Sequence, residues 1–503
     1  MQRFDLLVIG GGINGVGIAA DAAGRGLRVL LVEKGDLGGA TSSSSSKLIH
    51  GGLRYLEHYE FRLVRAALAE REVLMRRAPH IIWPLRFVLP HVTGLRPKWM
   101  IRLGLALYDN LARRKAIPGS TGLDLAVDPA AGGLKPGLER GFAYWDCWVD
   151  DARLVILNAI AAKAAGAEIA TRTELMTARP DGGRWIATLA APSGSRTIEA
   201  AAIVNATGPW VESVGRRIAV ARGVAGAIRN DAPHVRLVKG SHVVVPRFTG
   251  TDSAFLLQSS DGRVVFVLPF EDHFSLIGTT DVPIDGDPGA ATPSDAEVHY
   301  LLTLVGRFFR SPPTPADIVW RFAGVRPLVD DESANPSAAS RDWRLELSPP
   351  GAGGPLLSVI GGKVTTFRRL AEAALERLAP HLPPMRPAWT ATATLPGGDI
   401  PSGGPASYAQ RLAGSYPAID ARYLALLARR YGSRAHDLLG DASTPADLGE
   451  RLGPALSERE VRFLVAEEWA ATPDDILWRR TKAGLHVAPA ERTDLADRVA
   501  RLI

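Results

Sequence analysis

The chain opens with Phe4-Asp5-Leu6-Leu7-Val8-Ile9-Gly10-Gly11-Gly12-Ile13-Asn14-Gly15, and this stretch decides the fold. Its apolar half, residues 4–9, predicts a buried parallel strand, because a strand covered on both faces reads as a continuous apolar run. Its second half places Gly10, Gly12 and Gly15 in the spacing GxGxxG directly after that strand. A strand that runs into this spacing predicts a βαβ unit that binds a dinucleotide.

Each glycine of this pattern has a separate physical task. Gly10 makes the tight turn, Gly12 lets the backbone approach a pyrophosphate, and Gly15 lets the following helix pack closely against the strand. The helix predicted over residues 13–26 would direct its N-terminus, with its unpaired N–H groups, at the phosphates. An ordinary βαβ turn without a ligand is the alternative reading of such a glycine pattern.

The second strand of the unit, predicted over residues 28–32, ends in Glu33. A carboxylate at this place accepts hydrogen bonds from ribose hydroxyls and disfavours a 2′-phosphate, so it argues against NADP. The ordered series of strand, glycines, helix, strand and acid favours a bound dinucleotide over a ligand-free turn. These residues alone leave FAD and NAD both open.

The composition restricts the class of protein. With 503 residues, of which 46% are hydrophobic and 22% charged, the chain is an ordinary globular protein with room for about three domains. The single cysteine, Cys147, excludes an internal disulfide and suits a reducing cytoplasmic compartment. The sequence contains no metal-ligand spacing, no signal peptide and no apolar run of about 18 residues that would span a membrane. The net charge of +6 favours an anionic partner, namely a phosphorylated substrate, an acidic lipid surface or nucleic acid.

A serine-rich motif over residues 39–56 narrows the choice of cofactor. A serine run with paired glycines is suited to wrapping polar ligand atoms, and here it is followed by Leu48-Ile49-His50 and Leu53-Arg54-Tyr55-Leu56. On this motif the sequence closely resembles the FAD-dependent glycerol-3-phosphate dehydrogenases. The resemblance extends along most of the chain through residues 238–242 (VKGSH), 277–281 (IGTTD), 324–328 (GVRPL) and 361–367 (GGKVTTF).

The resemblance implies FAD as the cofactor and an α/β fold. We expect a doubly wound, Rossmann-like FAD-binding domain, an inserted antiparallel-sheet substrate domain and a C-terminal helical domain. The expected segments are 1–75, 151–215 and 340–395 for the FAD-binding domain, 76–150 and 216–339 for the substrate-binding or cap domain, and 405–503 for the helical domain. Alternating patterns predict antiparallel strands at 241–245, 263–268 and 274–277, and residues 396–404 read as a linker.

The fingerprint and the resembling motifs together predict the cofactor-binding residues. They are Gly10, Gly12, Ile13, Asn14, Gly15, Glu33, Lys34, Thr41, Ser42, Ser43, Ser46, Lys47, Leu48, Ala206, Gly208, Gly362, Lys363, Val364 and Thr365. Ala206 and Gly208 belong to an Ala-Thr-Gly turn after an apolar strand, and such a turn lets another backbone pass close to a dinucleotide.

Oxidation of a secondary alcohol requires removal of a hydride from carbon and of a proton from the hydroxyl group. FAD accepts the hydride, and the protein supplies a base. His50 and His242 are the candidate bases, because an unperturbed histidine has a pKa of about 6.5. His50 is favoured, since it follows the serine motif where the chain should skirt the flavin ring. The alternative for either histidine is a packing role.

Phosphate recognition calls for permanently charged donors, and arginine is the first choice. The substrate-binding residues implied by the resembling motifs are Arg54, Tyr55, Arg326, Arg341 and Lys363. Arg326 has the strongest context, because it is flanked by Val325, Pro327 and Leu328 rather than by solvated residues. Arg326 and Lys363 are also catalytic candidates, and Lys363 sits at a glycine-rich turn where its charge could stabilise the reduced flavin or the substrate.

Residues 86–115 form a basic segment with interleaved apolar and aromatic side chains, including Trp99, Met100, Leu103 and Tyr108. This pattern predicts a helix that lies on an anionic lipid surface, and a core-facing helix with a solvated basic face is the alternative. The resemblance implies a peripheral enzyme on the cytoplasmic side of the cell membrane that passes electrons to quinone. No recognition motif supports nucleic-acid binding, and a homodimer is the oligomeric hypothesis.

The expected activity is therefore FAD-dependent oxidation of sn-glycerol 3-phosphate to dihydroxyacetone phosphate, with quinone as the acceptor. An oxidase that reduces oxygen to hydrogen peroxide is the nearest alternative. An amine or amino-acid oxidase on a similar fold is a second alternative, against which the several arginines and the serine motif argue. A flavin-binding or membrane-associating protein without turnover represents a different class.

Overall fold

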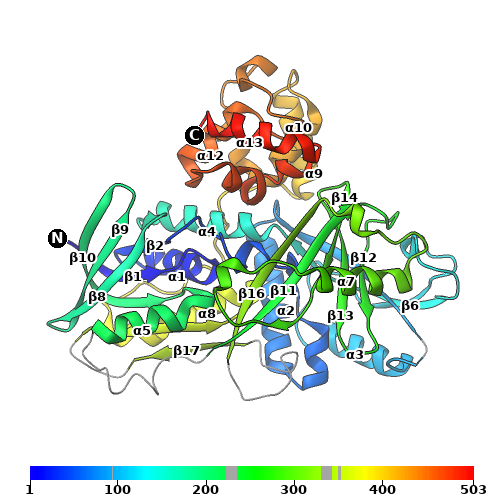
Figure 1. Ribbon diagram of the computed structural model, residues 1–503, viewed down its shortest axis with the longest axis horizontal. Coiled ribbons are helices and arrows are strands. Elements are labelled where there is room, and N and C mark those ends of the chain that lie inside the picture. Colours follow the sequence, from blue (N-terminus) through cyan, green and yellow to red (C-terminus); the bar gives the residue numbers. More distant parts are fainter. Residues whose placement is uncertain (93, 222–234, 330–341, 349–352) are drawn as a thin grey trace.

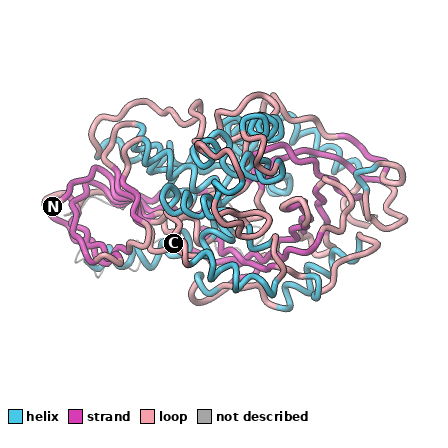
Figure 2. The backbone as a smooth tube through the Cα atoms, turned by 90° about the horizontal axis from the view of Figure 1, so that it is seen from above, coloured by secondary structure: helices cyan, strands magenta, loops and turns pink. Residues whose placement is uncertain are grey.

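The computed structural model describes residues 1–503 except 93, 222–234, 330–341 and 349–352. Two sheets stand side by side, and a bundle of helices formed by the C-terminal residues lies above them in Figure 1. From above, helices crowd the middle of the molecule and strands lie towards its two ends (Figure 2).

The first sheet contains the dinucleotide fingerprint. Its strand order is β17 (Trp343–Leu347), β18 (Leu356–Gly361), β10 (Gly194–Asn205), β1 (Gln2–Ile9), β2 (Val29–Val32) and β7 (Glu168–Ala170), and β10 also pairs with the hairpin β8 (Glu174–Asp181) and β9 (Arg184–Ala191). β1 is parallel to β2 and to β10, and its residues 4–9 are buried. The apolar run therefore forms a central strand, as its sequence predicts.

Helices cover both faces of this sheet. α1 (Ile13–Gly24) packs against α4 (Asp151–Ala164) and α8 (Phe367–Leu378), and together they form one large apolar core with β1 and β2. α5 (Val211–Ala221) and the β8–β9 hairpin enclose a second core on the other face. The close approach of α1 and α8 depends on Gly17, because a Cβ there would lie 2.6 Å from the Phe367 ring.

The second sheet is mainly antiparallel. Its order is β15 (Val282–Pro283), β11 (Val235–Pro246), β14 (Phe274–Gly278), β13 (Val264–Phe270), β12 (Ala254–Gln258), β4 (Ile82–Pro90), β6 (Arg140–Val149) and β3 (Leu48–Ile49), with β16 (Trp320–Val329) beside β11 and β5 (Thr121–Asp124) beside β6. The three predicted antiparallel strands are confirmed as β11, β13 and β14. β3, which follows the serine motif, pairs with β6 and so belongs to this sheet.

Side-chain alternation along β11 assigns the two faces of the second sheet. Val243 and Val245 point towards α7 (Asp295–Phe308), whereas Val244 points towards the core shared with α2 (Phe61–Arg77) and α3 (Lys98–Asn110). This period of two is the one expected of a strand that is buried on both faces.

The C-terminal helices form a separate apolar core. They are α9 (Gly404–Ser415), α10 (Ala421–Tyr431), α11 (Ala435–Leu439), α12 (Glu458–Glu468), the π-helix η11 (Asp475–Arg480) and α13 (Arg492–Ala500). The core of these helices includes Leu412, Tyr423, Leu427 and Leu464, and all of its buried members come from residues 408–499. The unit is thus a helical domain, and no helix among the described residues of the chain is long and apolar enough to cross a membrane.

Candidate functional site

A cavity of about 590 Å³ lies where the two sheets meet. Ile9, Val32 and Ala206 line it from the carboxyl ends of β1, β2 and β10, while Phe266 and Arg326 line it from the second sheet. The volume falls in the range typical of cofactor and small-molecule pockets. Its place at the carboxyl ends of parallel strands is the one where doubly wound sheets bind dinucleotides.

The glycine turn leaves room for a phosphate at the N-terminus of α1. Gly10 has a φ of 108°, and a Cβ on it would lie 2.6 Å from the carbonyl oxygen of Ala206. A Cβ on Gly15 would lie 1.9 Å from the Gly10 carbonyl oxygen, so Gly15 is required for packing below the cavity. Gly12 is the N-cap of α1 and borders the cavity. The surroundings of Gly10 and Gly15 thus require glycine, and the approach of the Gly12 backbone to a pyrophosphate stays a prediction.

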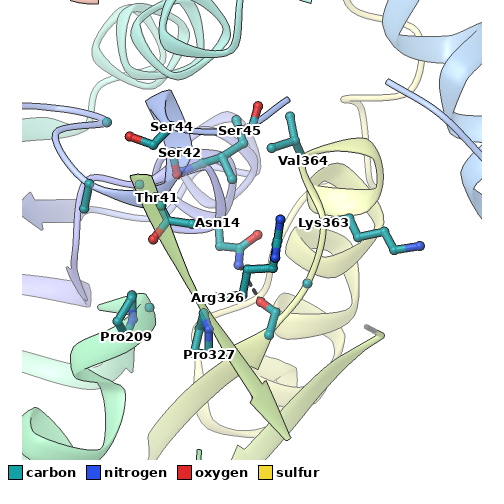
Figure 3. A pocket seen from close by; sticks show the side chains of 18 of the residues that line it. Asn14, Thr41, Ser42, Ser44, Ser45, Pro209, Arg326, Pro327, Lys363 and Val364 are labelled. Atoms are coloured by element: carbon teal, nitrogen blue, oxygen red, sulfur yellow. Dashed lines mark hydrogen bonds between the residues drawn. The ribbon is translucent and has the colours of Figure 1, made fainter. Parts of the chain in front are cut away.

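The Asn14 side chain provides independent evidence that the cavity suits a polar ligand. Its Nδ2 atom donates a hydrogen bond to the Gly361 carbonyl oxygen at 3.2 Å. Its Oδ1 atom is buried and has no hydrogen-bond partner among the described residues. Because a buried acceptor without a partner is costly, this atom fits a site that a polar cofactor completes. Figure 3 shows Asn14 beside Arg326 at the cavity wall.

Glu33 closes the turn as well as lining the cavity. Its two carboxylate oxygens accept hydrogen bonds from the backbone N–H groups of Gly11 and Gly35, each at 2.7 Å. Burial raises the pKa of Glu33, and these backbone hydrogen bonds oppose that shift. A carboxylate oxygen has two lone pairs, so ribose hydroxyls can still donate to the same group.

The serine motif bridges the two sheets. Ser42 Oγ accepts a hydrogen bond from the Ile13 N–H at 3.0 Å, and Thr41 Oγ1 donates to the Val325 carbonyl oxygen at 2.6 Å. In Figure 3, Thr41, Ser42, Ser44 and Ser45 gather on one side of the cavity. The motif therefore fastens the start of α1 to β16, the strand that carries Arg326.

One predicted catalytic residue and four predicted substrate-binding residues line the same cavity. His50, Arg54, Tyr55, Arg326 and Lys363 all line it. The Lys363 Nζ atom lies 3.6 Å from the centre of the Tyr55 ring, a cation–π contact. Arg326 NH1 donates to Asp281 Oδ1 at 2.7 Å, and its NH2 donates to Thr279 Oγ1 at 3.1 Å.

The backbone of His50 is fixed in the cavity wall by hydrogen bonds with the Thr365 side chain. Its N–H donates to Thr365 Oγ1 at 3.1 Å, and its carbonyl oxygen accepts from the same hydroxyl at 3.3 Å. The ring faces Phe266 edge-on, with 6.5 Å between ring centres. Thr365 follows the turn that carries Lys363, so the two segments predicted to flank the flavin are joined directly.

Comparison with known proteins agrees with this geometry. Residues 5–344 match the family model described as FAD dependent oxidoreductase, and residues 388–503 match the C-terminal domain of alpha-glycerophosphate oxidase. The chain is 51% identical to the aerobic glycerol-3-phosphate dehydrogenase of Escherichia coli over 96% of this chain and 95% of that protein. The chain belongs to the FAD-dependent glycerol-3-phosphate dehydrogenase family.

Other relatives and a solved structure agree with this membership. A D-erythritol 1-phosphate dehydrogenase from Brucella abortus is 49% identical over 99% of this chain and 97% of that protein. The structure of the glycerol-3-phosphate dehydrogenase from Bacillus halodurans complexed with FAD superposes with a TM-score of 0.74 at 26% identity, and covers 99% of this chain and 94% of that chain. FAD is therefore the cofactor of this dehydrogenase family member. When bound, FAD accepts a hydride from the substrate.

Four predicted residues that the structure describes lie outside the cavity lining of this dehydrogenase family member, namely Gly15, Ser43, Lys47 and His242. His242 is 1% exposed, stacks on Phe322 with 5.0 Å between ring centres and bonds through Nε2 to Ser46 Oγ at 2.9 Å. Burial, together with the charges of Arg326 and Lys47, holds the pKa of His242 well below its usual range. The structure therefore places the His242 ring behind Ser46 rather than in the cavity lining, which fits the packing alternative, and its role as a catalytic base stays a prediction.

Lys47 and Ser43 also do not face the cavity. Lys47 is buried, and its Nζ atom pairs with Asp151 Oδ1 at 2.7 Å and donates to the Ser43 carbonyl oxygen at 3.0 Å. A buried ammonium group needs a charged partner, which Asp151 provides. Through its bond to Ser43, the Lys47 side chain supports the serine motif from the side away from the cavity. The other predicted cofactor residues line the cavity or, like Gly15, pack beneath it. Arg341 lies outside the described residues.

Several residues of the cavity in this family member are not among the predicted site residues. They are Asp36, Thr173, Glu174, Leu175, Trp210, Arg217, Asp281 and Arg479. Trp210 directly follows the Ala-Thr-Gly turn and could have been added from that motif. Arg479 comes from the C-terminal domain, and no local pattern connects it to the fingerprint. Among the described residues there is no cluster of side chains placed to hold a metal ion.

Proposed function

We propose that this protein oxidises sn-glycerol 3-phosphate at C2 to dihydroxyacetone phosphate and passes the electrons to a membrane quinone. The observation that carries the proposal is the continuity of one cavity, which joins the dinucleotide fingerprint to the cations Arg54, Arg326 and Lys363. A phosphorylated polyol is the substrate class that these cations suit, and it is the class named for the relatives at about half identity.

In this proposal the protein residues bind, orient and deprotonate the alcohol. Arg326 binds the phosphate, and its contacts with Asp281 and Thr279 fix the plane of the guanidinium group. The Lys363 charge lies over the Tyr55 ring and stabilises negative charge that develops beside it. His50, which lines the same cavity, accepts the hydroxyl proton.

D-erythritol 1-phosphate is a second candidate substrate, because the relative that carries this name is nearly as similar as those named for glycerol 3-phosphate. Both compounds are phosphate esters of polyols, so the same phosphate-binding cations would serve either one.

The oxidase alternatives differ in how well they fit this cavity. The cations Arg54, Arg326 and Lys363 disfavour an amine or amino-acid oxidase, because such substrates carry no phosphate. The L-alpha-glycerophosphate oxidase of Mycoplasma pneumoniae shares the fold, with a TM-score of 0.61 at 18% identity.

The exposed apolar side chains of helix α3 support binding of the protein to a lipid surface. Ile101, Leu105 and Tyr108 face the core, whereas Trp99 is 67% exposed and Leu103 is 62% exposed. A core-facing helix with a solvated basic face explains only the buried set. An outward apolar face next to basic side chains such as Arg102 favours attachment to an anionic membrane, with the cytoplasmic face of the cell membrane as the site.

Charge reversal on this surface should separate membrane chemistry from substrate chemistry. In the Arg102→Glu, Arg113→Glu, Arg114→Glu triple variant, we expect loss of pelleting with anionic liposomes and loss of reduction of quinone held in them. The physical reason is that each basic residue near an anionic surface contributes about 1 kcal/mol of attraction. Oxidation of glycerol 3-phosphate with a soluble dye acceptor should stay at the wild-type rate, and oxygen should not be consumed by either protein.

A matched control reverses three exposed arginines of the C-terminal domain, Arg411, Arg422 and Arg462, which changes the net charge equally. This variant should bind liposomes as the wild type does. Equal release of both variants would mean that overall charge, rather than the α3 surface, governs binding. Oxygen consumption without quinone would assign the protein to the oxidases.

A further inference from the structure

The C-terminal helical domain reaches into the cofactor cavity. Arg479, on the π-helix η11, lines the cavity together with Asp36, which follows β2 and Glu33. Arg479 Nε donates to Asp36 Oδ2 at 2.5 Å. Arg480 donates to both oxygens of the same carboxylate, each at 2.7 Å. Two consecutive arginines of this domain therefore grip one acid of the flavin domain, and Arg480 is fully buried in doing so.

The loop over residues 33–36 is also held from its other side. The Glu33 carbonyl oxygen accepts from the Thr173 N–H at 2.8 Å, and the Gly35 carbonyl oxygen accepts from the Arg172 N–H at 3.0 Å. The Arg172 side chain pairs with Asp475, the first residue of the π-helix. Asp475 also pairs with Arg479. The loop thus lies between the end of β7 and the helical domain, and ion pairs join the two sides.

This loop borders the part of the cavity where the ribose of the adenosine half would lie. Glu33 is the acid at the end of β2 that doubly wound folds use for ribose hydroxyls. Its carboxylate orientation depends on the Gly35 N–H, which lies next to Asp36. A shift of Asp36 would therefore move the group that receives the ribose.

Other contacts anchor the helical domain independently of Arg479. Lys482 Nζ pairs with Asp150, the N-cap of α4, at 2.5 Å. Glu468 is fully buried and pairs with Arg153 of α4. Trp478 stacks on Trp320 of β16 with 5.0 Å between ring centres. Loss of the Arg479 side chain should therefore leave the domain in place and act locally on the loop.

We propose that the C-terminal helical domain sets the affinity for FAD, with Arg479 as a positioning residue that holds the 33–36 loop in the form that receives the adenosine ribose. The proposal rests on the placement of FAD in this cavity. In this proposal the helical domain contributes to the retention of FAD and takes no part in the chemical step.

The test is flavin binding by full-length apoprotein, measured by quenching of flavin fluorescence. In Arg479→Ala we expect the Kd for FAD to rise at least about tenfold, as expected for loss of a charge-assisted hydrogen bond at a partly buried site. ADP, measured by competition with FAD, should weaken by the same factor, because it carries the adenosine half. FMN, which lacks that half, should bind as it does to the wild type. The KM for glycerol 3-phosphate of the FAD-saturated variant should not change.

Two further variants complete the design. Arg462→Ala removes an exposed arginine of the same domain that pairs with Glu458, and its Kd for FAD should equal that of the wild type. Asp36→Asn weakens the ion pairs with both Arg479 and Arg480, so it should weaken FAD binding at least as much as Arg479→Ala does. Adding Arg479→Ala to Asp36→Asn should cost less than Arg479→Ala costs in the wild type, because the Arg479–Asp36 pair is already weakened. Equal weakening of FAD and FMN, or a lowered apoprotein Tm with an unchanged Kd, would overturn the proposal. A wild-type protein that fails to bind FAD would instead contradict the proposed function.

Discussion

Gly12→Val should give a colourless protein. Gly12 is the N-cap of α1 at the cavity wall, and a Cβ there would already lie 3.1 Å from Ser42 Oγ. The branched side chain would occupy the space in which the backbone approaches the pyrophosphate and would push against the hydroxyl that accepts from Ile13. We expect FAD affinity to fall by roughly a hundredfold, which corresponds to about 2.7 kcal/mol. The absorbance of the purified protein at saturating and limiting FAD measures this loss.

A glycine outside the cavity provides the control. Gly414 lies in α9 with no atom within 4 Å of a Cβ built on it, so Gly414→Val should keep its full FAD content. Stoichiometric FAD in purified Gly12→Val would show that the pyrophosphate does not lie at the N-terminus of α1.

Arg326→Lys should lower kcat/KM for glycerol 3-phosphate about thirtyfold or more, because charge-assisted hydrogen bonds to phosphate are each worth about 2 kcal/mol. The substitution keeps the charge and removes the planar fork. In the structure Asp281 and Thr279 orient that fork. Gly240 leaves the room for it, since a Cβ there would lie 2.5 Å from Arg326 NH2. A lysine cannot reproduce this arrangement.

The choice of substrate distinguishes a phosphate-binding role from a structural one. The loss in kcat/KM should be much smaller for unphosphorylated glycerol, which offers no phosphate to bind. FAD content should stay at the wild-type level, because in the proposed function Arg326 binds the substrate phosphate and not FAD. Equal losses with both compounds would mean that Arg326 supports the flavin or the fold.

The parts of this fold that the sequence predicts are those encoded by neighbouring residues. The buried strand, the glycine turn and the acid at Glu33 follow each other within one βαβ unit, so local periodicity and glycine spacing were enough to place them. The predicted helix over 13–26 ends at Gly24, because Gly26 adopts a φ of 95° that stops the helical repeat. The predicted antiparallel strands were equally local.

The parts that the sequence does not predict depend on partners far along the chain. Lys47 looked like a cofactor ligand, but its partner Asp151 makes it a buried support. His242 lies in a motif that resembles the family, yet its ring is buried against Phe322 and does not line the cavity. Arg479 enters the cavity only because the helical domain docks on the flavin domain. In each case burial and pairing, which follow from tertiary structure, decide what a charged residue does.

Helix α3 shows a different limit of sequence patterns. Its apolar residues fall into two sets, and one periodic pattern cannot say which set meets the core. The structure buries Ile101 and Leu105 and exposes Trp99 and Leu103. The outward set is the reason to place this surface against lipid, and the liposome experiment with the arginine variants tests that placement.

An anaerobic titration of the purified, FAD-containing protein with sn-glycerol 3-phosphate tests the central claim most directly. Substrate oxidation delivers a hydride to FAD, so the visible flavin absorbance should bleach as substrate is added, and dihydroxyacetone phosphate should form in equal amount to the flavin reduced. D-erythritol 1-phosphate, glycerol and a set of amino acids serve as parallel arms. Bleaching by glycerol 3-phosphate at the lowest concentration is the predicted result. An unchanged flavin spectrum with glycerol 3-phosphate, or bleaching by an amino acid instead, would contradict the account.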